Sequence, residues 1–260
     1  MTINENIVTQ KLVTETGLAV PGRKAVVDLV SNRTLGVVSN RYKVVTNDAL
    51  LRAIVPVAEE IGLQTEPQIV TCRGGAMSFF KFWGEKLRSE IGKGDIVRFG
   101  AEFFNSYDGS CLVGYHIIAE RLICLNGQVA PRTLQEVTFR HMSGTNPGII
   151  KKEFETFLPG VENTVGTWNR WNKIQPEYSR LEKFLEPVVP EKLRQQFLAD
   201  YTKLPDTDQT VWGFYNILTA YLTHNIRCRK AERIPLKQFE LGEEFANKLD
   251  TEFRAEISLN

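Results

Sequence analysis

The chain has 260 residues, of which 42% are hydrophobic, 10% aromatic and 24% charged, a composition typical of globular proteins. Its 32 lysines and arginines nearly balance its 31 aspartates and glutamates, which excludes a protein that holds a nucleic-acid duplex by bulk positive charge. No apolar run reaches the ~18–20 residues of a membrane span, and the N-terminus has no signal-peptide core, so no membrane partner is expected.

The part of the chain before residue 148 is predicted to be rich in β-strands. Turn-forming residues 31–34 separate two β-branched runs, and Asp108-Gly109 separates two longer apolar runs, so each predicts a hairpin. Asn126-Gly127 predicts a further turn, and residues 143–148 a loop. The expected strands are 24–30, 35–39, 42–45, 69–73, 76–83, 96–105, 111–125 and 137–141.

One helix is expected among these strands, over 49–61. Asn47 and Asp48 offer an N-cap, Gly62 ends the helix, and Pro56 is expected to disturb it.

After Gly148 the apolar spacing becomes helical. The expected helices are 149–158, 177–185, 190–204, 210–225 and 236–256, joined by loops that contain Pro159-Gly160, Pro187, Pro190 and Pro205. We therefore expect an α+β fold. A β-rich domain with a mostly antiparallel sheet spans 1–148, and a helical C-terminal region, 149–260, packs on it.

Cysteines and histidines give no metal-binding pattern. The cysteines form no Cys-x-x-Cys pair, which fits thiols of a reducing cytoplasm, and the histidines show no i, i+4 spacing. The glycine-rich loops of nucleotide enzymes are also missing. The sequence therefore implies no metal and no cofactor. The residues concerned are Cys72, Cys111, Cys124, Cys228, His116, His141 and His224.

Four pieces of sequence in this order carry a family resemblance: 35–45 with Asn47, 104–110, 120–127 and 139–141. Together they resemble the phage/plasmid-like protein family classed as domain of unknown function 932, over about residues 33–150. The resemblance implies a gene carried by phages or plasmids, a bacterial cytoplasm, and a suspected role in DNA metabolism. The helical remainder carries no such resemblance.

Arg41, Tyr42 and Lys43 place two cations around an aromatic ring at the end of an extended segment. In single-stranded nucleic-acid binding, such a ring stacks on a base while the cations contact phosphates. The alternative is a solvated strand edge with a half-buried tyrosine.

Arg121, Arg140 and His141 are expected on neighbouring strands, where they would form a small cationic surface. Guanidinium groups suit phosphate because of their planar two-donor fork. The alternative for Arg121 is a structural ion pair with Glu102 or Glu136.

Further basic and aromatic residues are outer candidates for nucleic-acid contact: Lys81 within 79–83, Arg170 and Trp171 within 168–173, and the basic run 226–233. Exposed rings beside cations would form a stacking platform. The alternative is that the aromatic residues are core and that the basic run is favoured by a helix macrodipole.

The polar loop with Asn105, Ser106, Asp108 and Gly109 has two interpretations. It presents a carboxylate and hydroxyls to a metal or a phosphate, or it serves the backbone of a tight hairpin.

The leading hypothesis is therefore a homo-oligomeric protein that binds single-stranded DNA in replication or recombination, with an annealing-type role. One alternative is a counter-defence or regulatory protein that binds a host protein. The other is a metal-assisted nuclease or nucleotidyl transferase that uses Asp108 with Glu102 or Glu120.

Overall fold

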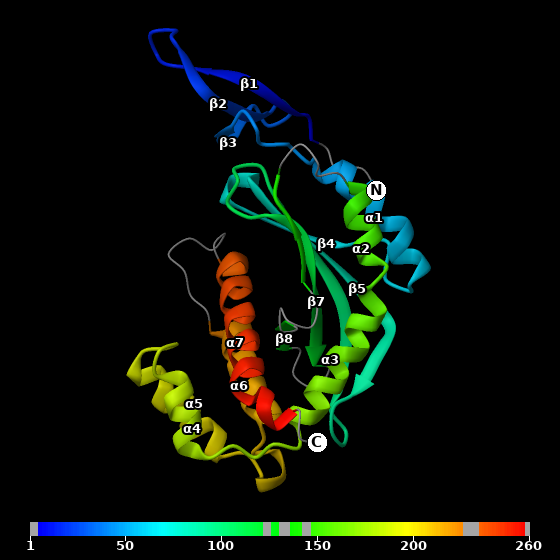
Figure 1. Ribbon diagram of the computed structural model, residues 1–260, viewed down its shortest axis with the longest axis vertical. Helices are drawn as coiled ribbons and strands as arrows, with labels where there is room; N and C mark the ends of the chain where they lie inside the picture. Colours follow the sequence, from blue (N-terminus) through cyan, green and yellow to red (C-terminus); the bar gives the residue numbers. More distant parts are fainter. Residues whose placement is uncertain (1–4, 122–125, 130–135, 142–146, 226–233, 258–260) are drawn as a thin grey trace. The chain divides into compact units, whose positions relative to one another are not determined.

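The computed structural model of the protein describes residues 5–121, 126–129, 136–141, 147–225 and 234–257 (Figure 1). Both sheets and helices are present, as the α+β expectation requires, and the layout of strands followed by helices holds roughly. Among the described residues, no helix is long and apolar enough to cross a membrane.

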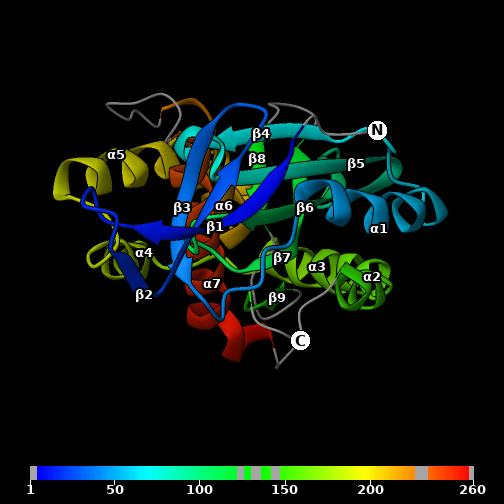
Figure 2. The same ribbon diagram turned by 90° about the horizontal axis from the view of Figure 1, so that it is seen from above.

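The strands form two sheets. One has the order β1-β2-β3 and the other the order β4-β5-β6-β7-β8, with β9 also paired to β7. Figure 2 shows β1, β2 and β3 side by side. The strands are β1 Ile7–Val13, β2 Ala19–Asp28, β3 Arg33–Ser39, β4 Gln68–Cys72, β5 Met77–Glu90, β6 Ile96–Ser106, β7 Val113–Arg121, β8 Asn126–Val129 and β9 Glu136–Phe139.

One helix lies among the strands and the others follow them. They are α1 Asn47–Glu60, α2 Pro147–Phe154, α3 Phe157–Trp171, α4 Tyr178–Leu185, α5 Glu191–Thr202, α6 Val211–His224 and α7 Ile234–Ile257, with short 3-10 turns η1 Arg73–Gly75 and η2 Asp206–Asp208.

The chain forms two compact units that are interleaved in sequence. The first comprises Met1–Leu87, Gly100–Ile117 and Glu136–Leu158, and the second Arg88–Phe99, Ile118–Gln135 and Pro159–Asn260. Strands β5, β6 and β7 each contribute residues to both units. This division differs from the expected one into 1–148 and 149–260.

The core of the first unit is aromatic. Phe103 of β6 contacts Phe154 of α2 edge to face, with ring centroids 4.8 Å apart, and Tyr115 of β7 contacts both rings. Helix α1 packs against α2. These contacts fix the sheet of β5–β7 from one face, because large buried rings dominate core energetics.

The sheet of β1–β3 has its own small core in the same unit. Val26 and Val38 pack with the buried ring of Tyr107, at the β6–β7 turn. Gly36 allows this approach, because a Cβ there would lie 2.4 Å from the Asp108 Cα atom. Strand β3 is therefore in direct contact with the polar loop that contains Asn105, Ser106, Asp108 and Gly109, called the motif loop below.

The N-terminus of α1 is capped by three different parts of the chain. Thr46 Oγ1 accepts from the N–H of Ala49, Glu5 from that of Asp48, and the Tyr107 hydroxyl from that of Asn47. These acceptors satisfy donors that a helix leaves free. The helix runs through Pro56 to Glu60, and Ile61 is its C-cap, followed by Gly62 with φ +82°.

The second unit is built around Trp168 of α3. Its ring stacks on Phe99 with centroids 5.6 Å apart and lies 5.0 Å from the ring of Trp212 in α6. Helix α6 also contacts α5, α7 and β8.

Four local predictions are wrong. Residues 42–45 were expected to form a strand but have irregular backbone between β3 and α1. Pro159-Gly160 was expected in a loop but lies in α3, since proline is tolerated in the first turn of a helix. Asn126-Gly127 was expected to turn but belongs to β8, where it pairs with β7. Pro147-Gly148 begins α2, while residues 143–146 of the expected loop lie outside the described residues.

Candidate functional site

Two segments of the first unit, 41–43 and 140–141, meet although they are far apart in sequence. The N–H of Lys43 donates to the carbonyl of His141 at 2.9 Å, and His141 Nδ1 lies 3.2 Å from the carbonyl oxygen of Lys43. The rings of Tyr42 and His141 stack, with centroids 4.5 Å apart and an interplanar angle of 17°. The structure thus joins residues that the sequence suggested separately.

This stacked pair is uncharged and mostly enclosed. Burial raises the pKa of Tyr42 well above its ordinary value, and its hydroxyl donates to the carbonyl of Ser106 at 2.6 Å. Burial lowers the pKa of His141, which is 6% exposed. In the neutral imidazole, Nδ1–H donates to Lys43, and the buried Nε2 has no hydrogen-bond partner among the described residues. The stacked rings of Tyr42 and His141 therefore have a structural role and carry no positive charge.

Positively charged side chains are close in sequence to the stacked rings of Tyr42 and His141. Arg41, Lys43 and Arg140 are exposed. Neither Arg41 nor Lys43 has an ion-pair partner within the described part of the chain. Arg41 and Lys43 are therefore available to an anionic partner.

The sheet of β1–β3 adds two cations that the sequence analysis missed. Lys11 lies directly opposite Lys24 across β1 and β2. Lys24 is half-buried and lies on the same face as Val26, because side chains two apart on a strand share a face, and Tyr42 packs against the cluster that contains Val26. The basic surface defined here comprises Lys11, Lys24, Arg41, Lys43 and Arg140. Only the β1–β2 register reveals the lysine pair.

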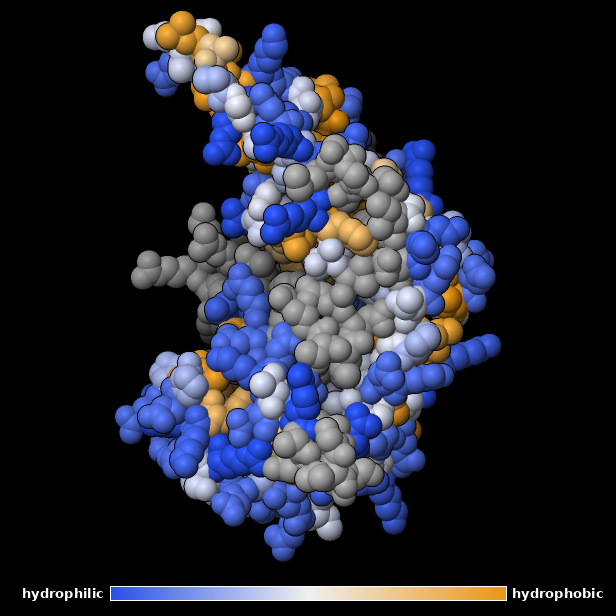
Figure 3. Space-filling model, viewed as in Figure 1, coloured by the Kyte–Doolittle hydropathy of each residue, from blue (hydrophilic) through white to orange (hydrophobic). Residues whose placement is uncertain are grey.

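Like charges placed directly opposite each other destabilise a sheet. The Lys11–Lys24 pair is therefore costly for the fold alone, and a bound anion would relieve it. Figure 3 shows hydrophilic side chains along this sheet and hydrophobic ones at the end of the β1–β2 hairpin, where Val13 and Leu18 are 53% and 68% exposed.

The motif loop serves the hairpin. Asn105 is buried and donates to the carbonyl of Val45 and to Asn47, while Ser106 donates to the carbonyl of Cys111. Asp108 pairs with Arg73 at 2.7 Å and accepts from the N–H of Ser110. Gly109 has φ +74°, as such a turn requires. Of the two interpretations, these contacts support the structural one.

Lys81 is part of a charged row across three strands of the first unit. Its Nζ lies 3.3 Å from Glu102, and Glu102 lies 2.9 Å from His116 Nε2. Burial disfavours the Glu102 carboxylate, but Lys81 and His116 outweigh it and hold the pKa of Glu102 below its ordinary value. The neighbouring rings of Phe79 and Trp83 are buried, so the alternative that these aromatic residues belong to the core is confirmed.

Trp171 is another correction. Its ring is fully buried in the second unit and meets Tyr215 edge to face. Arg170 is half-buried and donates to Thr167 Oγ1 at 3.0 Å. An aromatic residue on a helix is buried when another helix covers it, and periodicity alone does not show this. The basic run 226–233 lies outside the described residues.

Arg121 belongs to the second unit, whereas Arg140 and His141 belong to the first. Its Nε donates to Asp95 Oδ1 at 2.6 Å, and the indole N–H of Trp212 donates to Asp95 Oδ2 at 2.8 Å. The alternative of an ion pair is thus confirmed, with Asp95 in place of Glu102 or Glu136.

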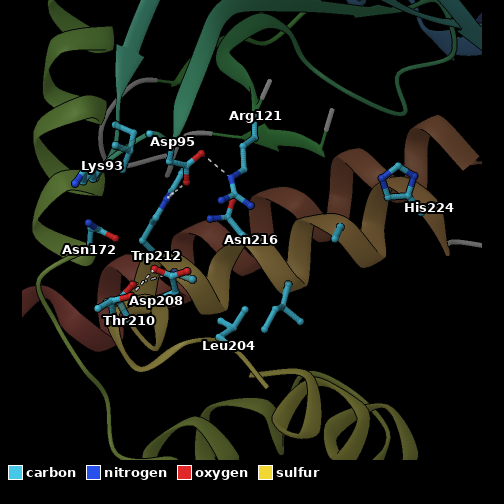
Figure 4. A pocket seen from close by; sticks show the side chains of 17 residues that line it. Lys93, Asp95, Arg121, Asn172, Leu204, Asp208, Thr210, Trp212, Asn216 and His224 are labelled. Carbon is cyan, nitrogen blue, oxygen red and sulfur yellow. Dashed lines mark hydrogen bonds and ion pairs between the residues drawn. The ribbon is translucent and has the colours of Figure 1, made fainter. Parts of the chain in front are cut away.

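Arg121 and Asp95 line a pocket of about 890 Å³ within the second unit (Figure 4). One side is the β5–β6 turn, residues 91–95, and another is the η2 segment before α6. A third side is a stripe of α6, namely Gly213, Asn216, Ile217, Ala220 and His224. These α6 positions share a face because they recur at helical spacing.

The carboxylates of the nuclease alternative each have a cationic partner: Asp108 with Arg73, Glu102 with Lys81, and Glu120 with Arg98. In the part of the chain that the structure describes, no group of three or more His, Cys, Asp and Glu residues could hold a metal ion.

Comparison with known families agrees with the motif pattern. A family model described as a domain of unknown function (DUF932) matches residues 34–239. The chain belongs to this family. The match extends through the helices to α7, so the resemblance expected for 33–150 alone was too short. No curated protein and no solved structure gives a significant match to the chain.

Proposed function

We propose that the protein binds single-stranded DNA through the basic surface of its first unit, in the replication or recombination of a phage or plasmid. The observation that carries this proposal is the junction of 41–43 with 140–141, which places exposed cations around a rigid ring pair. Flexible single strands are bound by cations that track the phosphates.

The chemistry of the surface favours phosphates over bases. Tyr42 is half-buried and one face of its ring is covered by His141, so the ring pair holds the backbone in place more than it offers a stacking platform. If Lys11, Lys24, Arg41 and Lys43 each contact a phosphate of a single strand, the log–log salt slope is about −2.8. Binding of this kind depends little on sequence.

Annealing requires copies of the protein to act together, and we include self-association in the proposal. The exposed Val13 and Leu18 at the end of the β1–β2 hairpin are the apolar candidates for contacts between copies. Exposed apolar side chains that gather in one place commonly mark interaction surfaces.

Fluorescence anisotropy with a labelled strand of about 40 nucleotides, measured at several salt concentrations, tests the proposal. Arg41→Gln and Lys24→Gln should each weaken binding and reduce the slope by about 0.7. Arg23→Gln is the matched control, because Arg23 is exposed on the same strand and alternation places it on the opposite face from Lys24.

No binding at low salt, or equal losses for Lys24→Gln and Arg23→Gln, would contradict the proposal. Absence of DNA binding would favour the alternative in which the protein binds a host protein, since an apolar protein interface depends weakly on salt.

A further inference from the structure

We propose that two copies of the chain associate by pairing their β1 strands antiparallel across a twofold axis at Gln10. The pairing joins the two β1–β3 sheets into one continuous sheet, with β1 of each copy at its centre. It defines an interface for the self-association that is included in the proposed function, but it does not require DNA. Twofold dimers are the commonest symmetric assemblies of soluble proteins.

The outer edge of β1 is open. Strand β1 lies at one end of the order β1-β2-β3, and among the described residues no strand or side chain hydrogen-bonds to its other edge. The side chains of Thr9, Gln10 and Lys11 are exposed. An open edge presents a row of unpaired N–H and C=O groups, which a strand of another chain can extend.

The hydrogen bonds at both ends of β1 show which of its residues face outward. The N–H of Leu29 donates to the carbonyl of Asn6 at 2.9 Å. At the other end, the N–H of Thr14 donates to the carbonyl of Leu18 at 2.8 Å. Asn6 and Thr14 therefore face β2, and in an antiparallel ladder such positions alternate with positions that face away. The outward backbone groups thus belong to the odd-numbered residues Ile7, Thr9, Lys11 and Val13.

This alternation leaves few registers for two β1 strands. They exchange backbone hydrogen bonds only when odd-numbered residues lie opposite each other, so near the strand centre the axis falls at Thr9, Gln10 or Lys11. An axis at Lys11 would place two lysines directly opposite, which is destabilising. An axis at Thr9 would place the charge of Lys11 opposite the apolar Ile7. The last residue, Val13, would then lie beyond the end of the partner strand.

An axis at Gln10 matches the residues in character. The strand reads IVTQKLV, with two apolar residues at each end and three polar residues between them. The opposed residues are Ile7 and Val13, Val8 and Leu12, and Thr9 and Lys11, with one member of each pair from either copy. Every outward backbone group of the strand then has a partner, and Val13, now 53% exposed, is covered. Strand register follows such hydrophobic patterns.

Strand β1 is continuous along its open edge. Its register with β2 shifts between Lys11 and Val13, where Leu12 alone lies opposite residues 20–23 of β2, so the extra residues are in β2. At the other end of the sheet, the extra residue is Leu35 in the edge strand β3 itself. A bulge of this kind blunts an edge, which is why the proposal concerns β1.

The contact is small, so the dimer should be weak. Seven residues at about 3.4 Å each give a contact of about 24 Å in length and two strands in width. This is less than the roughly 1,200–2,000 Å² that stable interfaces bury. We therefore expect a dissociation constant in the micromolar range and a dimer that forms as the protein concentration rises.

The pairing also gathers lysines of both copies on one face. Lys11 lies opposite Lys24 within each copy, and across the axis the two Lys11 residues are diagonal neighbours, about 7–8 Å apart. Their repulsion opposes the dimer, so salt that screens it should strengthen the dimer. A bound single strand would act in the same direction, a consequence that rests on the proposed function.

Sedimentation equilibrium of the full chain without DNA, between about 1 and 500 µM, tests the pairing. Thr9→Pro removes one outward N–H, which proline at an edge position can do without breaking the β1–β2 ladder. It should raise the dissociation constant at least about tenfold, since each copy loses a hydrogen bond and gains a steric obstacle. Thr9→Val, which keeps the N–H and the β-branched shape, is the matched control and should dimerise like wild type.

Gln10→Cys tests the position of the axis. In this register the two introduced thiols lie in a non-hydrogen-bonded pair with Cα atoms about 4.5 Å apart, within the range of a disulfide. With oxidised glutathione, Gln10→Cys should form a covalent dimer at least about tenfold faster than Thr9→Cys, whose counterpart in the second copy is Lys11. Wild type measures any cross-linking through the native cysteines.

A chain that stays monomeric over the whole concentration range would overturn the proposal. A dimer that Thr9→Pro leaves intact, or equal cross-linking of Gln10→Cys and Thr9→Cys, would place the contact elsewhere and also overturn it. Thermal unfolding shows that each variant is folded. A dimer without DNA binding would contradict the proposed function alone, whereas DNA binding by a monomer would contradict this pairing and leave the DNA contacts standing.

Discussion

Two arginines show how differently the two units use positive charge. Arg41 of the first unit is exposed and has no ion-pair partner in the described part of the chain. Arg121 of the second unit is held by Asp95, whose side chain is 10% exposed. An open cation attracts any nearby phosphate and is screened by salt, whereas a held guanidinium selects by geometry and is screened less.

The surroundings of the cations also differ between the two units. Arg41 and Lys43 are exposed and flank Tyr42, whose ring stacks on His141, while Lys11 and Lys24 lie opposite each other on β1 and β2. The pocket encloses its cation among α6, η2 and the β5–β6 turn.

The largest expected effect is the loss of unfolding free energy when the ion-pair partner of Arg121 is removed. Asp95→Ala removes the partner of Arg121 and the acceptor of the Trp212 indole, so the free energy of unfolding should fall by about 3 kcal/mol. Urea unfolding measures it. Asp200→Ala, which breaks the exposed pair with Lys203, should cost less than about 1 kcal/mol. Similar losses for the two variants would show that burial of the Asp95–Arg121 pair adds nothing to its contribution to stability.

The ring pair should matter for stability and little for DNA. Tyr42→Phe removes the hydrogen bond to the Ser106 carbonyl and keeps the stack on His141, which should cost about 1 kcal/mol of unfolding free energy. The salt slope of DNA binding should stay unchanged, because no charge is lost. A clear change in slope would show that the tyrosine hydroxyl itself contacts the strand.

His141 should make the first unit sensitive to mild acid. Because burial lowers its pKa below the ordinary 6.5, the unfolded chain binds the proton more readily than the folded one. Its contribution to stability is present above pH 6.5 and is lost as the pH falls through 6.5 towards the lower folded pKa. Urea unfolding of wild type and His141→Phe between about pH 7.5 and pH 5.5 measures the difference. Equal pH slopes for the two proteins would contradict the assignment.

The smallest expected effect has an opposite sign for stability and function. Lys24→Gln removes the like-charge pair with Lys11, so the unfolding free energy should rise by a few tenths of a kcal/mol, roughly the scale of cross-strand pairs. The same variant should bind single-stranded DNA more weakly. A loss of stability would show that Lys24 is held by packing of its aliphatic stem.

The sequence predicted those features that local signals determine. Asp108-Gly109 predicted the β6–β7 turn because its glycine needs a positive φ, and the periodicity of 177–185 predicted α4. The contact of Lys43 with His141 joins residues 98 positions apart, and no local pattern records such a pairing.

Errors arose where tertiary contacts decide the outcome. The ring of Trp171 is buried because α6 supplies Tyr215 against it, although its neighbours in sequence are polar. Arg121 was assigned correctly to an ion pair as one alternative, but the choice of Asp95 depends on which strands become neighbours. The Lys11–Lys24 pair requires the strand register, which a one-residue shift would abolish.

The interleaving of the two units has a consequence for synthesis on the ribosome. The first unit requires Glu136–Leu158, while Arg88–Phe99 of the second unit emerges long before its helices. At roughly 5–20 residues per second, the nascent chain spends several seconds with both units incomplete. Neither unit can be cut out as a continuous fragment, and the second unit cannot be complete until its last segment, Pro159–Asn260, has been translated.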